Sequence, residues 1–424
     1  MGFKSRPFLT NDALVKAPHV SLLLLSLFGL PLNSEVVPIA PDSSDWCLPP
    51  NPGLLVDDPD ASPLQKLQFG GYFHIHSAHV DGRAEGRDFS YARQSEWRRA
   101  RISATAEVFD CLSLLAHVNV VSDEGRDGGG EEWDYNGLFL AWAELDLKHL
   151  TEVEALDNWK FGYGKRKLKE LSEEMDTSIN SILTVERSSF AGQLVPFRAG
   201  TGTTGAWMMG GRGDDSFSVG LYSTDATPEI GNWSDGILLV GAWKHDFSEA
   251  WGCDQAEFSL GGGVQDVDGN DEVYSPWEWV ITPWIKWSCD RWTLRASLAY
   301  GSNEGPNSST GGDFYGFSIT PEYDLVPNRL QAVLRYSHMA SDGPQGVQLT
   351  SRYAREAGRT ANEGIPSLST GRGDRHHSIY AGMVWWPCPK RLSVLGGVEW
   401  EQLKSGGADV YQGTTAWFGT RLMF

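Results

Sequence analysis

Sixteen segments that alternate polar and apolar side chains set the strongest limit on how this chain can fold. The alternation is clearest in residues 99–108 and in the last ten residues, 415–424. A period of two residues places successive side chains on opposite faces, which is the pattern of a β-strand. The segments lie at 67–79, 95–108, 112–121, 136–146, 158–166, 204–211, 216–223, 236–246, 255–265, 276–287, 292–301, 313–324, 329–339, 375–387, 391–402 and 411–424. The chain is therefore predicted to be all-β.

The connections between these segments are sorted by length. Those after even-numbered segments are mostly short: 109–111, 212–215, 288–291, 326–328 and 387–389. Those after odd-numbered segments are longer, above all 167–203 and 340–374. An even strand number with short periplasmic turns and long extracellular loops is typical of transmembrane β-barrels. Residues 66–424 are accordingly predicted to form a sixteen-stranded antiparallel transmembrane barrel.

Apolar positions of such a barrel must face lipid, because sixteen strands enclose an aqueous channel and not a packed core. Trp and Tyr gather near the ends of the segments, as the aromatic girdles at the two membrane surfaces require. Both observations predict localisation in an outer membrane.

The N-terminal residues favour export. Lys4, Arg6 and Lys16 precede an apolar run at 20–32, which is the pattern of a signal peptide and is too short to span a bilayer as a helix. We assign residues 1–34 to the signal peptide. Residues 35–65 are interpreted as an acidic, Pro-rich periplasmic linker, because 35–64 hold six acids and neither Lys nor Arg.

Composition and motifs exclude several function classes. Beyond the N-terminus no apolar stretch reaches the roughly 20 residues of a membrane-spanning helix. A formal net charge of −20 argues against nucleic-acid binding, which needs a basic surface. No Ser/His/Asp set stands in a recognisable motif, so we expect neither an enzyme nor a cofactor.

Two candidate metal sites are incomplete. Residues 266–271 begin like a calcium loop but lack its later ligands. His74 and His76 have no third metal ligand, which favours a role in lining the channel.

Five cysteines raise the question of disulfides, which export would permit. Cys111, Cys253, Cys289 and Cys388 fall in predicted periplasmic turns, and Cys47 falls in the linker. A Cys253–Cys289 bridge is disfavoured, because turns two strands apart lie roughly 10 Å from each other. That exceeds the Cα–Cα limit of about 7 Å. A bond from Cys47 to one of the turns is a second open possibility.

A family resemblance rests on three stretches and the last residue. Residues 97–102 and 107–110 read as a strand entering a tight turn, and 159–166 and 184–188 are similar to the same family. The terminal Phe424 matches the assembly signal of outer-membrane barrels. In these features the chain resembles the phosphate-selective porin O and P family. The resemblance implies a sixteen-stranded, usually trimeric channel that is selective for anions.

Alternation also predicts which charges face the bore. These are Arg99, Arg101, Lys160, Arg295, Arg335 and Arg421, with Lys286, and the acids Glu107, Glu322, Glu399 and Glu401. Rings of Arg and Lys attract phosphate-like anions. The alternative for any single one of them is that it only hydrates and braces the wall.

The third long connection, 167–203, is by resemblance the constriction loop that folds into the channel. Its basic candidates are Lys165, Arg166, Lys167, Lys169 and Arg187, with Arg198 further on. Against them stand Glu170, Glu173, Glu174, Asp176 and Glu186. Charges of both signs would orient a permeating solute, whereas an external helix with solvated charges is the alternative.

Together these expectations describe a diffusion channel for small anions such as phosphate, without covalent chemistry. Its expected partners are small anionic solutes, outer-membrane lipid and two further copies in a homotrimer. Two alternatives stay open. One is a structural or adhesive barrel whose loops plug the pore, and the other is a sugar-permeable porin whose aromatic residues line the bore.

Overall fold

The computed structural model describes residue 47 and residues 52–121, 133–195, 202–225, 227–234, 236–266, 274–303, 310–351, 353–354 and 371–424, apart from the side chains of 93 and 94. The expected signal peptide, about half of the linker and the greater part of the calcium-like segment 266–271 lie outside these residues. In the described residues no helix is both long and apolar enough to cross a membrane.

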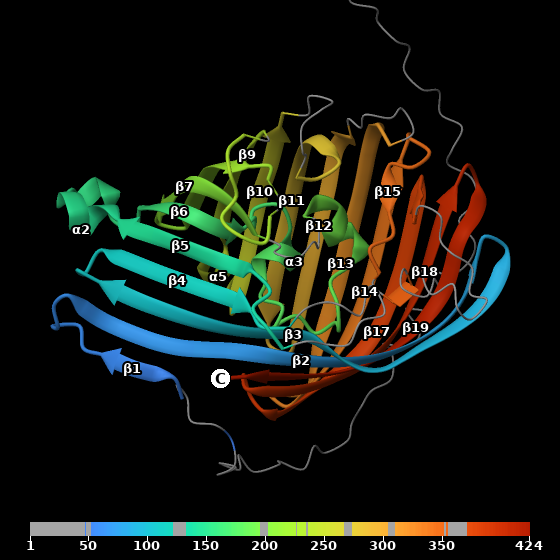
Figure 1. Ribbon diagram of the computed structural model, residues 1–424, viewed down its shortest axis with the longest axis horizontal. Coiled ribbons are helices and arrows are strands. Elements are labelled where there is room, and N and C mark those ends of the chain that lie inside the picture. Colours follow the sequence, from blue (N-terminus) through green and yellow to red (C-terminus); the bar gives the residue numbers. More distant parts are fainter. Residues whose placement is uncertain are drawn as a thin grey trace, which may run out of the picture. The chain divides into compact units, whose positions relative to one another are not determined.

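Strands dominate the described chain (Figure 1). They are β1 Leu54–Asp57, β2 Leu64–Ala84, β3 Arg87–Val108, β4 Leu112–Asn119, β5 Leu138–Asp146, β6 Lys160–Lys167, β7 Gly202–Arg212, β8 Asp215–Ser223, β9 Ile237–Asp246, β10 Gln255–Gln265, β11 Trp277–Cys289, β12 Trp292–Asn303, β13 Gly312–Val326, β14 Leu330–Ser341, β15 Val347–Gln348, β16 Arg372–Gly373, β17 Arg375–Cys388, β18 Leu392–Ser405 and β19 Ala408–Met423. The helices are short: α2 Leu147–Thr151, the 3-10 turn η2 Glu154–Leu156, α3 Glu173–Asp176, α4 Ser189–Leu194 and α5 Ser248–Trp251.

Sixteen of these strands form one closed antiparallel barrel, which confirms the predicted strand number and fold class. The ring runs from β2 to β14 in chain order and continues through β17, β18 and β19. It closes where β19 pairs with β2, with Arg421 opposite His74. At the end of this seam the Gly71 N–H donates to the Phe424 carbonyl (3.0 Å), and the Phe424 N–H donates to the Gly71 carbonyl (3.1 Å).

Side chains alternate across the wall in the predicted direction. Leu298 and Val398 are exposed outside at 56% and 49%, whereas their sequence neighbours Ser297 and Glu399 point inward and are 4% and 5% exposed. A soluble barrel would show the reverse, since water would wet its outside. An apolar exterior around a polar interior is the arrangement that a membrane barrel needs.

The two ends of the barrel differ, and we call them the turn end and the loop end. The turn end carries the connections 109–111, 213–214, 290–291, 327–329 and 389–391, together with Phe424. At the loop end the chain leaves β6 and β14 and returns to β7 and β17, so this end is where the two longest connections begin and finish.

Two connections at the loop end are nevertheless tight, which departs from the predicted pattern of long loops there. The β2–β3 hairpin turns on Glu85 and Gly86 (φ 50° and 81°), and the β18–β19 hairpin turns on Gly406 and Gly407 (φ 58° and 84°). Two consecutive positive φ angles define the turn whose twist matches paired strands.

The β2–β3 hairpin also reaches beyond the apolar zone. The 21 residues of β2 are about twice the 9–11 that cross a bilayer. Towards the turn end the apolar Ile75 faces outward and the polar His74 faces inward. Nearer the hairpin the order is reversed: the polar His79 is outside and the apolar Val80 is buried inside. The polarity of the two faces therefore reverses along this strand, as it must once the outside is water.

The expected linker is partly structured. Its residues Leu54–Asp57 form β1, which pairs with the first residues of β2. Further back, Cys47 forms a disulfide with Cys388 at the β17–β18 turn, with the Cα atoms 5.7 Å apart. A bond from Cys47 to a turn, left open by the sequence, is therefore present.

The prediction that Cys253 and Cys289 lie too far apart is wrong. Cys253 lies two residues before the start of β10, and Cys289 ends β11, the strand that pairs with β10. Gln255 lies opposite Ser288, so the two cysteines belong to neighbouring strands. Their Sγ atoms lie 2.6 Å apart. Both are free thiols in the structure, as is Cys111, which has no described cysteine partner.

We expect Cys253 and Cys289 to form a disulfide when the protein is isolated from an oxidising compartment. Their sulfur atoms lie closer together than the van der Waals contact distance of two non-bonded sulfurs. Alkylation of the denatured, non-reduced protein should then modify Cys111 alone, and reduction should expose all the remaining cysteines. Intact mass measures both. A Cys289→Ser control should make Cys253 reactive, and alkylation of Cys253 in the unmodified sequence would contradict the expectation.

Candidate functional site

The connection between β6 and β7 folds into the barrel, and we call its residues 168–195 the inner loop. Leu168, Leu171, Val185, Phe190 and Leu194 are at most 1% exposed. The short helix α3 of this loop lies inside the ring of strands (Figure 1). The alternative of an external helix with solvated charges is therefore not what the structure shows.

Arginines of the wall hold the inner loop in place. Arg295 on β12 donates to the Glu173 carboxylate (2.6 Å) and to Glu322 on the neighbouring strand (2.9 Å). Arg421 on β19 donates to the carbonyls of Ile182 and Thr184 at 2.6 and 2.7 Å. A guanidinium taken out of water needs several acceptors, and the backbone of the loop supplies them.

Arg335 on β14 makes a third attachment. Its Nη1 donates to the Glu186 carbonyl (2.9 Å), and its Nη2 pairs with Glu399 (2.9 Å). Because Arg335 is 1% exposed, solvent screens neither contact.

Glu186 is tied to the wall a second time, through its side chain. Arg98 Nε and Arg99 Nη2 lie 2.6 and 2.8 Å from its carboxylate oxygens. Burial would raise the pKa of this carboxyl, but the two guanidinium groups outweigh it and hold the pKa well below its usual range. Glu186 therefore stays ionised at neutral pH.

A second segment joins the inner loop on the same side of the bore. Leu349 and Tyr353 are fully buried, and Gln193 Nε2 of the inner loop donates to the Gly346 carbonyl (3.1 Å). Ring contact between Tyr353 and Trp417 at 5.1 Å packs the segment against β19. The half of the interior bounded by β12–β19 is thus largely occupied by protein.

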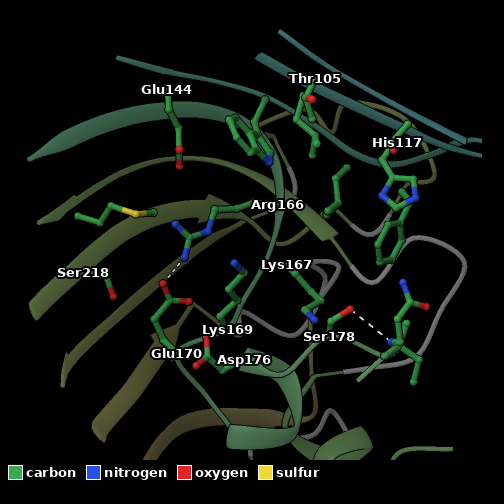
Figure 2. A pocket seen from close by; sticks show the side chains of 18 of the residues that line it. Thr105, His117, Glu144, Arg166, Lys167, Lys169, Glu170, Asp176, Ser178 and Ser218 are labelled. Atoms are coloured by element: carbon green, nitrogen blue, oxygen red, sulfur yellow. Dashed lines mark hydrogen bonds and ion pairs between the residues drawn. The ribbon is translucent and has the colours of Figure 1, made fainter. Parts of the chain in front are cut away.

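The other half contains a cavity of about 1370 Å³ between the inner loop and the wall from β2 to β11. Figure 2 shows side chains of both surfaces pointing into this space. The described cations that line it are Arg98, Arg99, Arg101, Lys160, Arg166, Lys167, Lys169, Arg187 and Lys244, and the carboxylates are Glu144, Glu170, Asp176 and Asp215. Nine cations face four carboxylates, so the lining is basic.

Each of these four carboxylates has a polar partner. Glu170 pairs with Arg166, as Figure 2 shows, and Asp176 accepts from Lys244 Nζ at 3.1 Å. Glu144 accepts from Trp207 Nε1 (2.9 Å), and Asp215 pairs with His245 (2.9 Å).

Five cations of the lining, in contrast, pair with no carboxylate of the described residues: Arg101, Lys160, Lys167, Lys169 and Arg187. Arg101 is held by Asn119 (2.7 Å) and by the Tyr72 hydroxyl, and its guanidinium lies 3.4 Å above the Phe139 ring. Arg187 donates to the carbonyls of Glu174 and Thr177. Their charge is left for whatever occupies the cavity.

The structure sorts the basic residues predicted from the sequence into two groups. Arg99, Arg101, Lys160, Arg166, Lys167, Lys169 and Arg187 line the cavity. Arg295, Arg335 and Arg421 point inward as expected. We correct their role, because the inner loop covers them and they bind the loop instead of solvent.

His74 and His76 are buried inside, and no described group of three His, Cys, Asp or Glu could hold a metal ion.

Lys165 is corrected as well. It shares the outward parity of Phe161 and Tyr163, and its Nζ donates to the carbonyls of Thr227 and Glu229 at 2.7 and 3.1 Å. The connection between β8 and β9 thus covers Lys165 away from the cavity.

Arg98 and Lys244 also line the cavity but are not among the basic residues predicted from the sequence. His74 lies opposite Arg99 but Ile75 lies opposite Trp97, so Arg98 is an extra residue in a β-bulge and no strict alternation could place it. Lys244 continues the inward series of Leu238 and Val240, so alternation could have found it.

Similarity to solved structures agrees with this architecture. The outer-membrane channel DcaP of Acinetobacter baumannii has a TM-score of 0.51 and 12% identity, over 85% of this chain and 97% of that one. The anion-selective porin from Comamonas acidovorans has 0.50 and 13%, over 84% and 99%, and OprB of Pseudomonas putida has 0.50 and 9%, over 84% and 94%. No family model and no curated protein matches the sequence.

At these identities the likeness shows the fold alone, which is that of the outer-membrane porins. The fold together with the apolar exterior places the barrel in an outer membrane.

We expect Arg335→Gln to destabilise the protein by about 3–5 kcal/mol, because Glu399 is left buried without its charged partner. Thermal unfolding in detergent measures the loss, and single-channel recordings should show a noisier current as the inner loop detaches. Arg83→Gln is the matched control. Arg83 pairs with Asp88 at 3.3 Å on the surface and is 64% exposed, so its loss should cost about 0–1 kcal/mol. Equal shifts for the two variants would contradict the role of Arg335.

Proposed function

We propose that this protein is an outer-membrane diffusion channel for small anions, including phosphate. The observation that carries the proposal is the cavity beside the inner loop, where five cations have no carboxylate partner among the described residues. Fixed positive charge in a narrow passage raises the local concentration of anions and lowers that of cations. The turn end would face the periplasm, as short turns do in such barrels.

The inner loop would act as the constriction. It brings Lys169 and Arg187 to the cavity, next to Lys167 at the end of β6, and the wall supplies Arg101 and Lys160. A solute that passes between these surfaces meets cations on both sides. The Comamonas acidovorans neighbour is described as anion-selective, which agrees with this proposal without extending it to phosphate.

The negative net charge of the whole chain does not oppose an anion channel. Residues 35–64 carry six of the acids, and residues 122–135 carry six more against one Arg. Electrostatic attraction depends on the charges that line the passage and not on the sum over the molecule.

The homotrimer stays a prediction.

A second candidate function is a structural barrel with a plugged pore. It is favoured by the inner loop and by residues 346–351 and 353–354, which occupy the half of the interior next to β12–β19. A conductance near zero in planar bilayers would support this candidate, because an open channel conducts steadily.

We expect the wild type to give an anion-selective reversal potential in a KCl gradient, and Lys167→Glu with Lys169→Glu to move it towards cation selectivity. The double change leaves seven cations against six carboxylates in the lining. Lys390→Glu is the control, since Lys390 is exposed at the β17–β18 turn and does not line the cavity. A double variant with the wild-type potential would remove these lysines from the mechanism, and a cation-selective wild type would overturn the proposed function.

A further inference from the structure

A cluster of basic side chains lies on the outer face of the barrel, away from the channel. His338 on β14, Arg375 and His377 on β17, and Lys404 on β18 form this cluster, which we call the outer basic patch. Register brings them together, because His338 is directly opposite His377 and Arg375 is directly opposite Lys404. The two imidazole rings are 4.4 Å apart.

The patch faces outward, because its sequence neighbours fill the inner face. His376 and Ser378 are fully buried, as is Ser337 on β14, whereas Arg375 between Asp374 and His376 is exposed. Among the described residues Arg375 forms no ion pair, and Lys404 has only a distant one, with Asp409 at 3.8 Å. The patch thus presents positive charge that the protein itself leaves largely uncompensated.

Aromatic rings lie directly below the cations, towards the turn end. Phe317 and Tyr336 are 5.5 Å apart, and the Tyr336 hydroxyl lies 3.0 Å from His377 Nδ1. Phe317 also contacts the His338 ring at 5.7 Å. Such rings prefer the boundary between the headgroups and the hydrocarbon of a membrane.

Aliphatic side chains follow the aromatic ones. Ile319 and Ile379 are exposed below the rings, and Met383 lies further along β17. From the loop end inward the surface therefore changes from cations to aromatic rings to aliphatic groups. This is the order of phosphate, interface and acyl chain in one leaflet of a membrane.

We propose that the outer basic patch binds the phosphate groups of a phosphorylated glycolipid in the outer leaflet, with the acyl chains on the aliphatic surface beneath. Arg375 and Lys404 contact the phosphate, since charge-assisted hydrogen bonds from guanidinium and ammonium groups are the strong ones for this ligand. The neighbouring imidazoles and Tyr336 provide polar contacts at the interface. The inference depends on the membrane position of the barrel and not on what the channel conducts.

The test is a titration of the purified full-length barrel in detergent with diphosphorylated lipid A, followed by native mass spectrometry. Saturable binding is expected, and Arg375→Gln with Lys404→Gln should weaken it at least about tenfold. Arg375→Lys should bind more tightly than Arg375→Gln, because it keeps the charge. The control Arg83→Gln removes a cation from β2 that already pairs with Asp88, so it should bind as the wild type does.

Two further arms identify the ligand. Dephosphorylated lipid A should bind more weakly than the diphosphorylated form, and millimolar inorganic phosphate should not displace the lipid. The proposal is overturned by a double variant with wild-type affinity, by equal binding of dephosphorylated lipid A, or by displacement with free phosphate. Unchanged conductance and heat-modifiable gel mobility show that each variant has folded, which separates a failed site from a failed barrel.

Discussion

The absence of water in the membrane interior is the constraint on which this structure depends. Every backbone N–H and C=O at that depth needs a partner within the protein, and a sheet meets this need only if it closes on itself. The pairing of β19 with β2 closes it, and the terminal Phe424 continues the hydrogen bonds to Gly71 at the end of the seam. Closure in turn fixes which face of each strand meets lipid and which meets the interior.

A second consequence of closure is that charged side chains gather inside, where they compete for acceptors. On the side of β12–β19 the inner loop meets this demand: its carbonyls accept from Arg335 and Arg421, and its Glu173 pairs with Arg295. The same contacts that fix the loop also keep these arginines covered, so that they do not line the cavity. Across the bore Arg101 and Lys160 line the cavity, and the described part of the inner loop does not bind them. The position of the loop thus determines both where the passage lies and which cations line it.

Much of this fold could be predicted from the sequence, because a period of two residues reports directly on the strand and on its two faces. The sixteen segments match the sixteen barrel strands, and the inward direction of Arg99 and Arg421 followed from the same alternation. Alternation cannot tell a free lumenal arginine from one that holds a loop, since the difference lies in residues far away in the chain. It also fails at irregular positions such as the bulge at Arg98.

The disulfide between Cys47 and Cys388 has a mechanical consequence. A pull on the chain ahead of Cys47 is transmitted first through a covalent bond to the junction of β17 and β18. It does not act on the hydrogen bonds of β2, where β1 is attached by only a few backbone pairs. Tension on the N-terminal segment therefore does not reach the seam between β19 and β2. Before such tension could separate these strands, a reductant would have to break the disulfide.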